Sequence, residues 1–476
     1  MVVGEVSTAT DVLVIGGGPG GYATALRCAG FGKSVVLVER DAVGGTCLNV
    51  GCIPSKVLIH AAELAQLPTM TAGTGVELQA SVDIQALAQH MSSVVGELTS
   101  GVETLLKAAG VKVISGTARF ARANRAVVST GDSVQHIEFE EAVVATGSRP
   151  VELAQLPFDG ERVVDSTGAL FNFGDVPSNL AVVGGGYLGV ELGTAWAKLG
   201  ASVTIVEAQP AILPELDPRL GRVVGRRLAE LGVSTMLGAK ATGLDAAGLT
   251  VETNGKTETV AADRVVVCVG RKPNTDDLGL DVVGVTTDSH GLIPVDPDRR
   301  AAKRILAIGD VTAGPALAHK ATAEAEVAAR TACGISASLD VAAIPAVVFS
   351  DPEVAMVGLT KAAAAAAGIE VSSFVFPLTA SARAKTLGQT LGHIELSADE
   401  QGTVIGANLA GPNVSELIGE VTLAIEMAAT VEELAATVHP HPTVSEGLLE
   451  AAHGLLGLPL HVTGRTPNRP PPRPQQ

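Results

Sequence analysis

Aromatic residues and positive charges are scarce in this sequence of 476 residues. Aromatic side chains make up only 3% of the chain, although 46% of its residues are hydrophobic, so we expect a core of mainly small aliphatic side chains. Such residues suit buried parallel strands that are covered by helices. The 33 lysines and arginines are outnumbered by 50 acidic residues, which gives a net charge of −17. A chain this acidic is a poor candidate for binding nucleic acid through the phosphates.

Long apolar runs and targeting signals are missing as well. No apolar stretch reaches the roughly 18 residues that a membrane-spanning helix needs. The first ten residues contain Glu5 and lack the basic start and apolar centre of a signal peptide. We therefore expect a cytoplasmic protein without a membrane partner, built from roughly three domains at about 150 residues each.

Cysteine is also rare, and two of the five cysteines are close neighbours. Without a secretion signal, a framework of structural disulfides is not expected. Cys47 and Cys52 are five residues apart, which is neither the usual redox spacing of thioredoxins nor a zinc spacing, and no second cysteine pair or histidine cluster follows. We therefore expect no metal site and interpret the pair as a redox dithiol, with two unrelated buried cysteines as the alternative.

A glycine-rich turn near the N-terminus has the pattern of a dinucleotide-binding loop. The apolar run at residues 11–15 leads into Gly16, Gly18 and Gly21, which fit G-x-G-x-x-G before a helix-like segment. A second apolar run ends at Glu39, 18 residues after Gly21, roughly where an acidic residue meets a ribose. Backbone N–H groups at the start of the helix would face a pyrophosphate.

The same pattern returns at a constant offset of 168 residues. Gly184, Gly186 and Gly189 repeat the glycines, and Glu207 repeats the acid. Two such loops on one chain predict two dinucleotides with electron transfer between them. No lysine or arginine follows Glu207 closely, and its carboxylate would repel a 2′-phosphate, so we predict NAD rather than NADP at the second loop.

The surroundings of the cysteine pair strengthen the redox interpretation. Gly44, Gly45 and Gly51 allow close backbone approach, and Pro54 suits the first turn of a helix. Cys52 is then expected near the N-terminus of that helix, where the dipole stabilises a thiolate.

The segment at residues 44–56, GGTCLNVGCIPSK, resembles the active-site signature of the class I pyridine nucleotide-disulfide oxidoreductases. Within that family the chain most resembles the enzymes that oxidise dihydrolipoamide through a cysteine pair and FAD and reduce NAD⁺. The resemblance extends from about residue 11 to about residue 460, and further motifs carry it at residues 145–150, 269–274, 308–310, 317–321 and 349–355.

The resemblance implies a role for particular residues of these motifs. Cys47 faces substrate and Cys52 faces flavin. The residues expected to bind FAD are Gly16, Gly18, Gly21, Glu39, Thr46, Lys56, Thr146, Gly147, Asp310, Ala318 and His319. Those expected to bind NAD are Gly184, Gly186, Gly189, Glu191, Glu207 and Gly270.

A histidine cluster near the C-terminus is the other chemical feature. Thiol–disulfide exchange with a dithiol needs a base, and histidine suits that task near neutral pH. On spacing alone, residues 438–446 could equally be a proline-rich turn. The segment resembles the family's His-x-His-Pro-Thr signature, which implies that His441 is the base, that Glu446 holds it, and that the bond to Pro442 is cis. It also implies that His441 acts on Cys47 of a partner subunit in a homodimer. Pro440 departs from the small residue of that pattern, which puts the local backbone hydrogen bonds in doubt.

We predict an α/β protein with two Rossmann-like dinucleotide-binding domains and a C-terminal α+β dimerisation domain. The expected FAD-binding domain comprises residues 1–150 and 275–343, the NAD-binding domain 151–274 and the interface domain 344–462, with a helix at 416–429. Residues 463–476 are proline-rich and expected to be disordered.

Two alternatives stay open from the sequence. One is another disulfide reductase of the family, of the mycothione type, whose cysteine motif is very similar. The other is a flavoprotein scaffold without catalysis. If the resemblance to the dihydrolipoamide-oxidising enzymes holds, the partner is the lipoyl-carrying subunit of a 2-oxoacid dehydrogenase complex.

Overall fold

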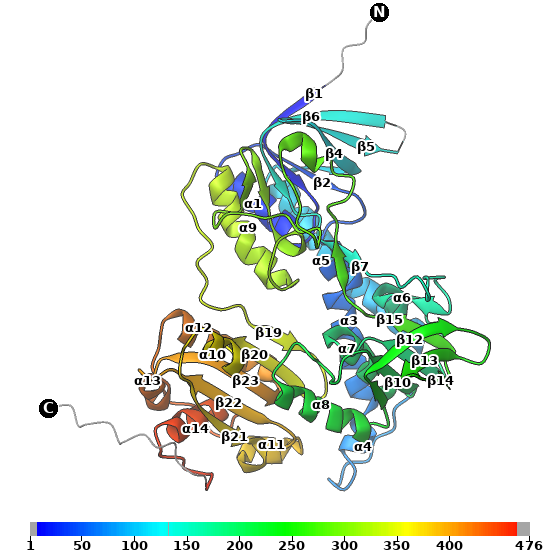
Figure 1. The fold of residues 1–476 in the computed structure, drawn as a ribbon, viewed down its shortest axis with the longest axis vertical. Coiled ribbons are helices and arrows are strands. Elements are labelled where there is room, and N and C mark those ends of the chain that lie inside the picture. The colour runs from blue at the N-terminus through cyan, green and yellow to red at the C-terminus, as the bar shows by residue number, and fades with distance from the viewer. Residues whose placement is uncertain (1–6, 132, 464–476) are drawn as a thin grey trace, which may run out of the picture.

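The computed structural model describes residues 7–131 and 133–463 and has the expected α/β architecture (Figure 1). The chain forms three sheet systems, and the first is completed by strands that follow the second in sequence. The fold class predicted from the sequence is confirmed. The expected disorder at 463–476 falls, from residue 464 onward, outside the described residues.

The first sheet is eight-stranded, with β18, β6, β1, β2 and β3 side by side in parallel and β17 at one edge. Its strands come from two distant segments of the chain. They are β1 (Ser7–Ile15), β2 (Val35–Glu39), β3 (Lys112–Ser115), β4 (Thr117–Arg122), β5 (Arg125–Thr130), β6 (Ser133–Val144), β17 (Arg300–Ala302) and β18 (Ile305–Ala307).

Helices from the same two segments accompany this sheet: α1 and α9 pack against its strands, and α3 packs against α5 and α7 (Tyr187–Lys198). Helix α1 lies directly against α9, as Figure 1 shows. The helices are α1 (Pro19–Gly30), α2 (Gly45–Val50), α3 (Cys52–Ala65), α4 (Leu67–Met70), α5 (Ile84–Ala108) and α9 (Ala318–Ala332), with the short turns η1 (Leu280–Val283) and η2 (Gly309–Val311).

The second sheet is parallel, in the order β11-β10-β9-β15-β8. Its strands are β8 (Val163–Val164), β9 (Asn179–Val183), β10 (Ser202–Glu207), β11 (Ser234–Leu237) and β15 (Arg264–Val267), and its helices are α6 (Ser166–Phe171), α7 (Tyr187–Lys198) and α8 (Pro218–Glu230). Two small antiparallel sheets accompany it: β12 (Ala239–Leu244), β13 (Leu249–Thr253) and β14 (Lys256–Val260), and the pair β7 (Ser148–Pro150) and β16 (Arg271–Pro273).

The third sheet is antiparallel, in the order β19-β20-β23-β22-β21. Its strands are β19 (Ala346–Val348), β20 (Glu353–Gly358), β21 (Ser372–Pro377), β22 (His393–Ala398) and β23 (Val404–Gly411). The helices are α10 (Lys361–Ala366), α11 (Ala382–Leu387), α12 (Val414–Glu426), α13 (Val431–Ala436) and α14 (Glu446–Leu455), with the turn η3 (Leu378–Ala380).

Helix α12 differs from the helix expected at residues 416–429. It starts two residues earlier because Val414 is fully buried and belongs to the core. It ends three residues earlier because Ala428 takes a left-handed φ of +49° and the Ala429 N–H turns back to Ala424 O at 2.8 Å.

The cores are aliphatic, as the composition predicts. The central strands are almost wholly valine, leucine, isoleucine and alanine, and Val12, Leu13, Val182 and Val265 have no exposed surface. Within the described residues, no helix combines the length and apolarity needed to cross a membrane. The same residues contain no group of three or more histidine, cysteine or acidic side chains placed to hold a metal ion.

Candidate active site

The first glycine-rich turn joins β1 to α1. Gly16 has a φ of +102°, and a Cβ atom there would lie 2.2 Å from the carbonyl oxygen of Ala145, so only glycine fits. Helix α1 begins after Gly18 without any side-chain cap, which leaves its first N–H groups free for a phosphate. Glu39 accepts a hydrogen bond from the Gly17 N–H at 2.6 Å. Its carboxylate is thereby fixed beside the turn, as ribose binding requires.

The second glycine-rich turn, between β9 and α7, repeats this geometry. Gly184 has a φ of +109°, and a Cβ atom there would lie 2.3 Å from Cys268 O. Glu207 accepts from the Gly185 N–H at 2.6 Å, the same contact that Glu39 makes. Gly186 precedes α7 and again provides no side-chain cap. Both turns therefore fit a dinucleotide pyrophosphate and ribose.

The segment after β6 of the first sheet and the segment after β15 of the second sheet pair as strands β7 and β16. Thr146 donates through Oγ1 to Asn274 O at 2.7 Å, and the Asn274 N–H donates to Gly147 O at 2.9 Å. Gly147 and Gly270 have φ values of +67° and +121°. These predicted residues thus shape the crossing of the chain between the two sheets.

Asp310 lies on the turn η2. Ser148 holds it directly and Arg271 holds Ser148, and neither residue was predicted as part of the site. Ser148 donates through Oγ to Asp310 Oδ2 at 2.5 Å, and Arg271 Nε donates to Ser148 Oγ at 2.7 Å. Both lie inside the motifs at 145–150 and 269–274, so the signal was present in the sequence although the pairing was not.

The cysteine pair spans the junction of two helices. Cys47 is part of α2, and Cys52 is the first residue of α3, as expected. Gly51 between them is required, because a Cβ atom there would lie 2.8 Å from Thr46 O. Cys52 is exposed and Cys47 is half-buried.

The two thiols have very different acidities. A hydrogen bond from Cys47 and the positive charge of Lys56 outweigh burial and lower the pKa of Cys52 to about 7. The hydrogen bond to Cys52, burial and the negative charge of Cys52 raise the pKa of Cys47. Of the two thiols, Cys52 is therefore the more easily ionised.

Lys56 and Glu191, expected at different cofactors, form one ion pair. Lys56 Nζ lies 2.8 Å from Glu191 Oε2, and Glu191 is 2% exposed. The other carboxylate oxygen accepts from the Phe349 N–H at 2.9 Å, and Lys56 also lies 4.4 Å from the Phe349 ring centroid. Glu191 thus connects the cysteine helix α3, its own helix α7 and the start of the third sheet.

Three other residues predicted to bind FAD lie in α2 and α9. Thr46 lies in α2 beside Cys47, and Ala318 is the first residue of α9. His319 Nε2 hydrogen-bonds Pro345 O at 2.7 Å, which connects α9 to the segment leading into the third sheet.

The predicted base, on the loop before α14, and its partner, the first residue of α14, form a dyad. His441 Nδ1 lies 2.8 Å from Glu446 Oε1, and the other oxygen of Glu446 accepts from the Thr443 N–H at 2.8 Å. Partial burial opposes ionisation of Glu446, but these two hydrogen bonds outweigh it and lower its pKa. The bond between His441 and Pro442 is cis, as the resemblance implied.

His441 stands apart from the cysteines of its own chain. Its side chain is 72% exposed, and in the described residues no hydrogen bond or ion pair joins it to Cys47 or Cys52. The base and the redox pair therefore occupy separate parts of one subunit.

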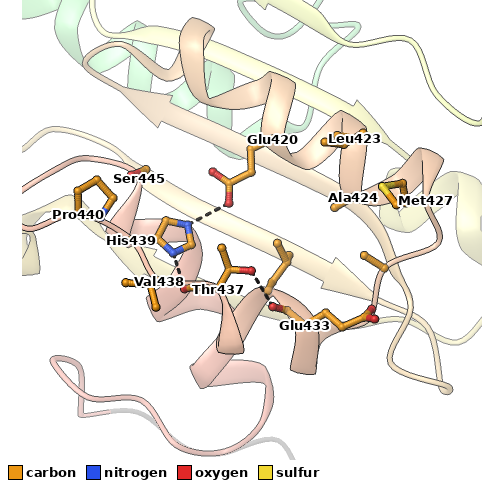
Figure 2. Close-up of a pocket in the computed structure, with 12 residues that line it drawn as sticks. Glu420, Leu423, Ala424, Met427, Glu433, Thr437, Val438, His439, Pro440 and Ser445 are labelled. Carbon is orange, nitrogen blue, oxygen red and sulfur yellow. Dashed lines mark hydrogen bonds and ion pairs between the residues drawn. The ribbon is translucent and has the colours of Figure 1, made fainter.

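Pro440 and the neighbouring His439 line a pocket beside this loop (Figure 2). Since proline lacks a backbone N–H, the hydrogen bonds around Pro440 are made by other groups. The neighbouring His439 hydrogen-bonds Thr437 O through Nδ1 and Glu420 Oε1 through Nε2, both at 2.9 Å. Pro440 uses its carbonyl oxygen to accept from Thr443 Oγ1 at 2.7 Å. Apolar side chains on the pocket rim are strongly exposed in the single chain, among them Leu423, Met427 and Val438.

The sequence matches two family models that together cover most of the chain. Residues 10–325 match pyridine nucleotide-disulphide oxidoreductases, and residues 344–452 match the dimerisation domain of the same proteins. The chain belongs to the pyridine nucleotide-disulphide oxidoreductase family. The resemblance inferred from residues 44–56 is confirmed, and the exposed apolar surface around α12 lies within the part that matches the dimerisation domain.

Curated relatives agree with this assignment. A dihydrolipoyl dehydrogenase of Geobacillus stearothermophilus is 45% identical over 97% of this chain and 99% of its own. One of Halobacterium salinarum is 45% identical over 98% of this chain and 100% of its own.

Solved structures have the same fold. LpdA from Mycobacterium tuberculosis superposes with a TM-score of 0.87 at 29% identity, over 94% of this chain and 99% of its own. The HOCl-induced flavoprotein disulfide reductase RclA from Escherichia coli gives 0.82 at 27% identity, over 93% of this chain and 99% of its own. The protein is a pyridine nucleotide-dependent flavoprotein disulfide oxidoreductase that uses FAD and NAD, and its C-terminal part is the dimerisation domain of that family.

Proposed function

We propose that the protein is a dihydrolipoyl dehydrogenase, which oxidises dihydrolipoamide to lipoamide and reduces NAD⁺ to NADH. The observation that carries this proposal is the presence, in one chain, of an asymmetric cysteine pair and of a histidine–carboxylate dyad. A dithiol substrate needs both: a disulfide to accept its electrons and a base to accept its proton. The hydrogen bond from Cys47 and the charge of Lys56 lower the pKa of Cys52, and Glu446 holds His441 through a hydrogen bond of 2.8 Å.

The first step is attack on the oxidised cysteine pair. His441, with Nδ1 held by Glu446, takes the proton of one substrate thiol through its free ring nitrogen. The substrate thiolate forms a bond to Cys47 Sγ and breaks the bond to Cys52, which leaves as a thiolate. Cys52 is suited to leave because its pKa is about 7.

The second step releases the product. The remaining substrate thiol attacks the sulfur bound to Cys47, forms the disulfide of lipoamide and returns Cys47 to the thiol form. The substrate has then lost two electrons and the cysteine pair has gained them. FAD, when bound, would supply the electron acceptor between the cysteine pair and NAD⁺.

The division of cofactor residues follows the two glycine-rich turns. We assign FAD to the Gly16–Gly21 turn, Glu39 and Asp310, and NAD to the Gly184–Gly189 turn and Glu207. Lys56 and Glu191 then act as a pair between the two cofactors. The corresponding domains are 1–150 with 275–343 for FAD, 151–274 for NAD and 344–462 for the subunit interface.

Three points support the finer assignments. Glu207 is buried beside its turn and opposes the 2′-phosphate of NADP. The separation of His441 from Cys47 within one chain supports a site shared between subunits, with His441 acting on Cys47 of the partner subunit. The curated relatives support a lipoyl-carrying subunit of a 2-oxoacid dehydrogenase complex as partner, and a cytoplasmic location.

Anaerobic reduction of the purified protein tests the assignment. We expect NADH to reduce the bound flavin faster than NADPH, and lipoamide to reoxidise the protein in preference to oxidised mycothiol, glutathione disulfide and Hg²⁺. Preference for oxidised mycothiol with NADPH would favour the mycothione-type reductase, and a protein without flavin absorbance would contradict the proposal.

A further inference from the structure

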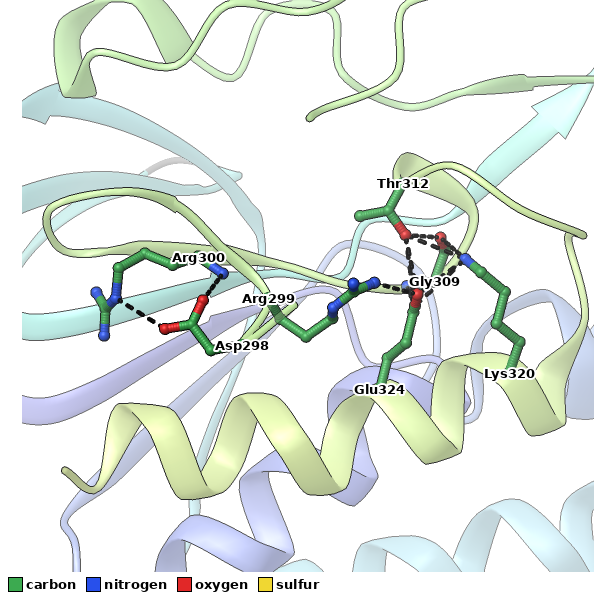
Figure 3. A network of polar contacts seen from close by, with 7 residues as sticks. All are labelled: Asp298, Arg299, Arg300, Gly309, Thr312, Lys320 and Glu324. Atoms are coloured by element: carbon green, nitrogen blue, oxygen red, sulfur yellow. Dashed lines mark hydrogen bonds and ion pairs between the residues drawn. The ribbon is translucent and has the colours of Figure 1, made fainter. Parts of the chain in front are cut away.

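A buried cluster of charges contacts Gly309, the residue before Asp310 in the turn η2 (Figure 3). Glu324 of α9 is 0% exposed and Lys320, one helical turn earlier, is 3% exposed. Arg299, from the loop before β17, completes the cluster with Nη1 at 2.8 Å from Glu324 Oε1. Burying three charges is costly unless each is paired, so this arrangement needs a reason beyond filling space.

The cluster bonds directly to the backbone of the turn η2. Glu324 Oε2 accepts from the Gly309 N–H at 2.6 Å, and Lys320 Nζ donates to Gly309 O at 3.0 Å. Lys320 also donates to Thr312 Oγ1 at 3.1 Å, and that hydroxyl donates to Gly309 O at 2.9 Å. Both polar groups of the residue before Asp310 are therefore fixed by side chains of the cluster.

The cluster joins two segments that each contain a left-handed residue. These are Gly309 and Arg299, with φ values of +75° and +67°; glycine adopts this conformation freely. For Arg299 this conformation costs on the order of 1 kcal/mol, which the ion pair to Glu324 offsets. On its other side, Asp310 is held by Ser148 at 2.5 Å, so the turn is fixed from both directions.

We infer that Glu324, Lys320 and Arg299 are positioning residues for FAD, which fix Asp310 and set the charge beside it. This inference rests on the proposed assignment of FAD to Asp310. The cluster contains two cations and one anion, so its net charge is positive. Removing the anion and removing a cation therefore have opposite electrostatic effects on a flavin that gains electrons.

Charge-removing variants of the intact holoenzyme test this role. Glu324→Gln is expected to raise the flavin midpoint potential and Lys320→Met to lower it, measured by equilibration with reference dyes. Both are expected to weaken FAD binding about tenfold or more, measured by flavin release on dilution. The double variant Glu324→Gln/Lys320→Met is expected to return the potential towards the wild-type value.

Glu326→Gln is the matched control, because Glu326 is on the same helix but exposed, paired with Arg27 and Arg330. It is expected to change neither quantity. Thr312→Val removes hydrogen bonds without charge, and it serves if Glu324→Gln does not fold: FAD release is then faster at an unchanged potential.

Shifts of the same sign in both single variants, or none beyond the control, would overturn the inference and leave the cluster a purely structural feature. The proposed function fails separately, if wild-type protein and control carry no FAD.

Discussion

Cys47 and Cys52 lie in the consecutive helices α2 and α3. His441, in contrast, lies on a loop, and its side chain is 72% exposed. Residues of the same chain lower the pKa of Cys52: Cys47 through a hydrogen bond and Lys56 through its charge. Lys56 is in turn held by an ion pair with the buried Glu191. The histidine is hydrogen-bonded to Glu446, and among the described residues no hydrogen bond or ion pair joins it to a thiol. The proposed mechanism therefore places the electron-storing pair within one subunit and makes proton transfer depend on the partner subunit.

Breaking the redox-active cysteine pair is expected to have the largest effect on turnover. Cys47→Ser leaves no disulfide for the substrate thiolate to attack, so lipoamide turnover falls by roughly 10⁴-fold or more. Flavin content stays unchanged, because no glycine-rich turn is touched. The measurements are dihydrolipoamide-dependent NADH formation and the flavin absorbance. Full activity in this variant would refute the mechanism.

Removing the base is expected to cost less. His441→Gln leaves the disulfide in place but removes the proton acceptor, and turnover is expected to fall by about 10²- to 10⁴-fold. Reduction of an artificial electron acceptor by NADH, which bypasses the cysteine pair, is expected to stay at the wild-type level. A loss in both assays would place His441 in a structural role.

A hybrid dimer separates the two regions most sharply. One subunit carries Cys47→Ser and the other His441→Gln, and the dimer is isolated with two affinity tags. If His441 acts across the interface, one of the two sites retains both groups, and the hybrid has about half of the wild-type activity. If it acts within its own chain, both sites are defective and the hybrid is inactive.

Breaking the internal ion pair is expected to affect stability and acidity together. Lys56→Met leaves Glu191 buried without its counterion, which costs about 3–5 kcal/mol in the free energy of unfolding. It also raises the pKa of Cys52 by about one unit, because a positive charge beside the thiolate is gone. Denaturant unfolding and a pH titration of the thiolate absorbance measure the two effects. Lys33→Met is a matched surface control.

The reduced protein is expected to depend on pH in a defined window. The pKa of Cys52 falls from 9.0 to about 7 on folding, so its thiolate contributes stability that is fully present above about pH 9 and lost as the pH falls through about 7. Cys52→Ser is expected to abolish this dependence in denaturation experiments under reducing conditions. An unchanged pH profile would show that the thiolate is not the cause.

The smallest of these effects is expected at the carboxylate of the dyad. Glu446→Gln retains a hydrogen-bond acceptor for His441 but loses the charge that stabilises its protonated form, so turnover falls about tenfold. A loss as large as that of His441→Gln would mean that Glu446 also holds the loop, through Thr443.

The sequence predicted local features well and long-range pairings poorly. Gly16 and Gly184 could be predicted because a positive φ and a close carbonyl require glycine at these positions. The Lys56–Glu191 pair could not, because its members are 135 residues apart and each suited a separate cofactor. The end of α12 was misplaced because Ala428 takes a left-handed conformation that nothing in its side chain requires.

The two oxygens of Glu191 also set an order of events during synthesis. One bonds Lys56, made early, and the other bonds the backbone of Phe349, made much later. A growing chain cannot complete this three-way junction until Phe349 has left the ribosome. Full tuning of the redox pair is thereby postponed until the segment that introduces the dimerisation domain is present.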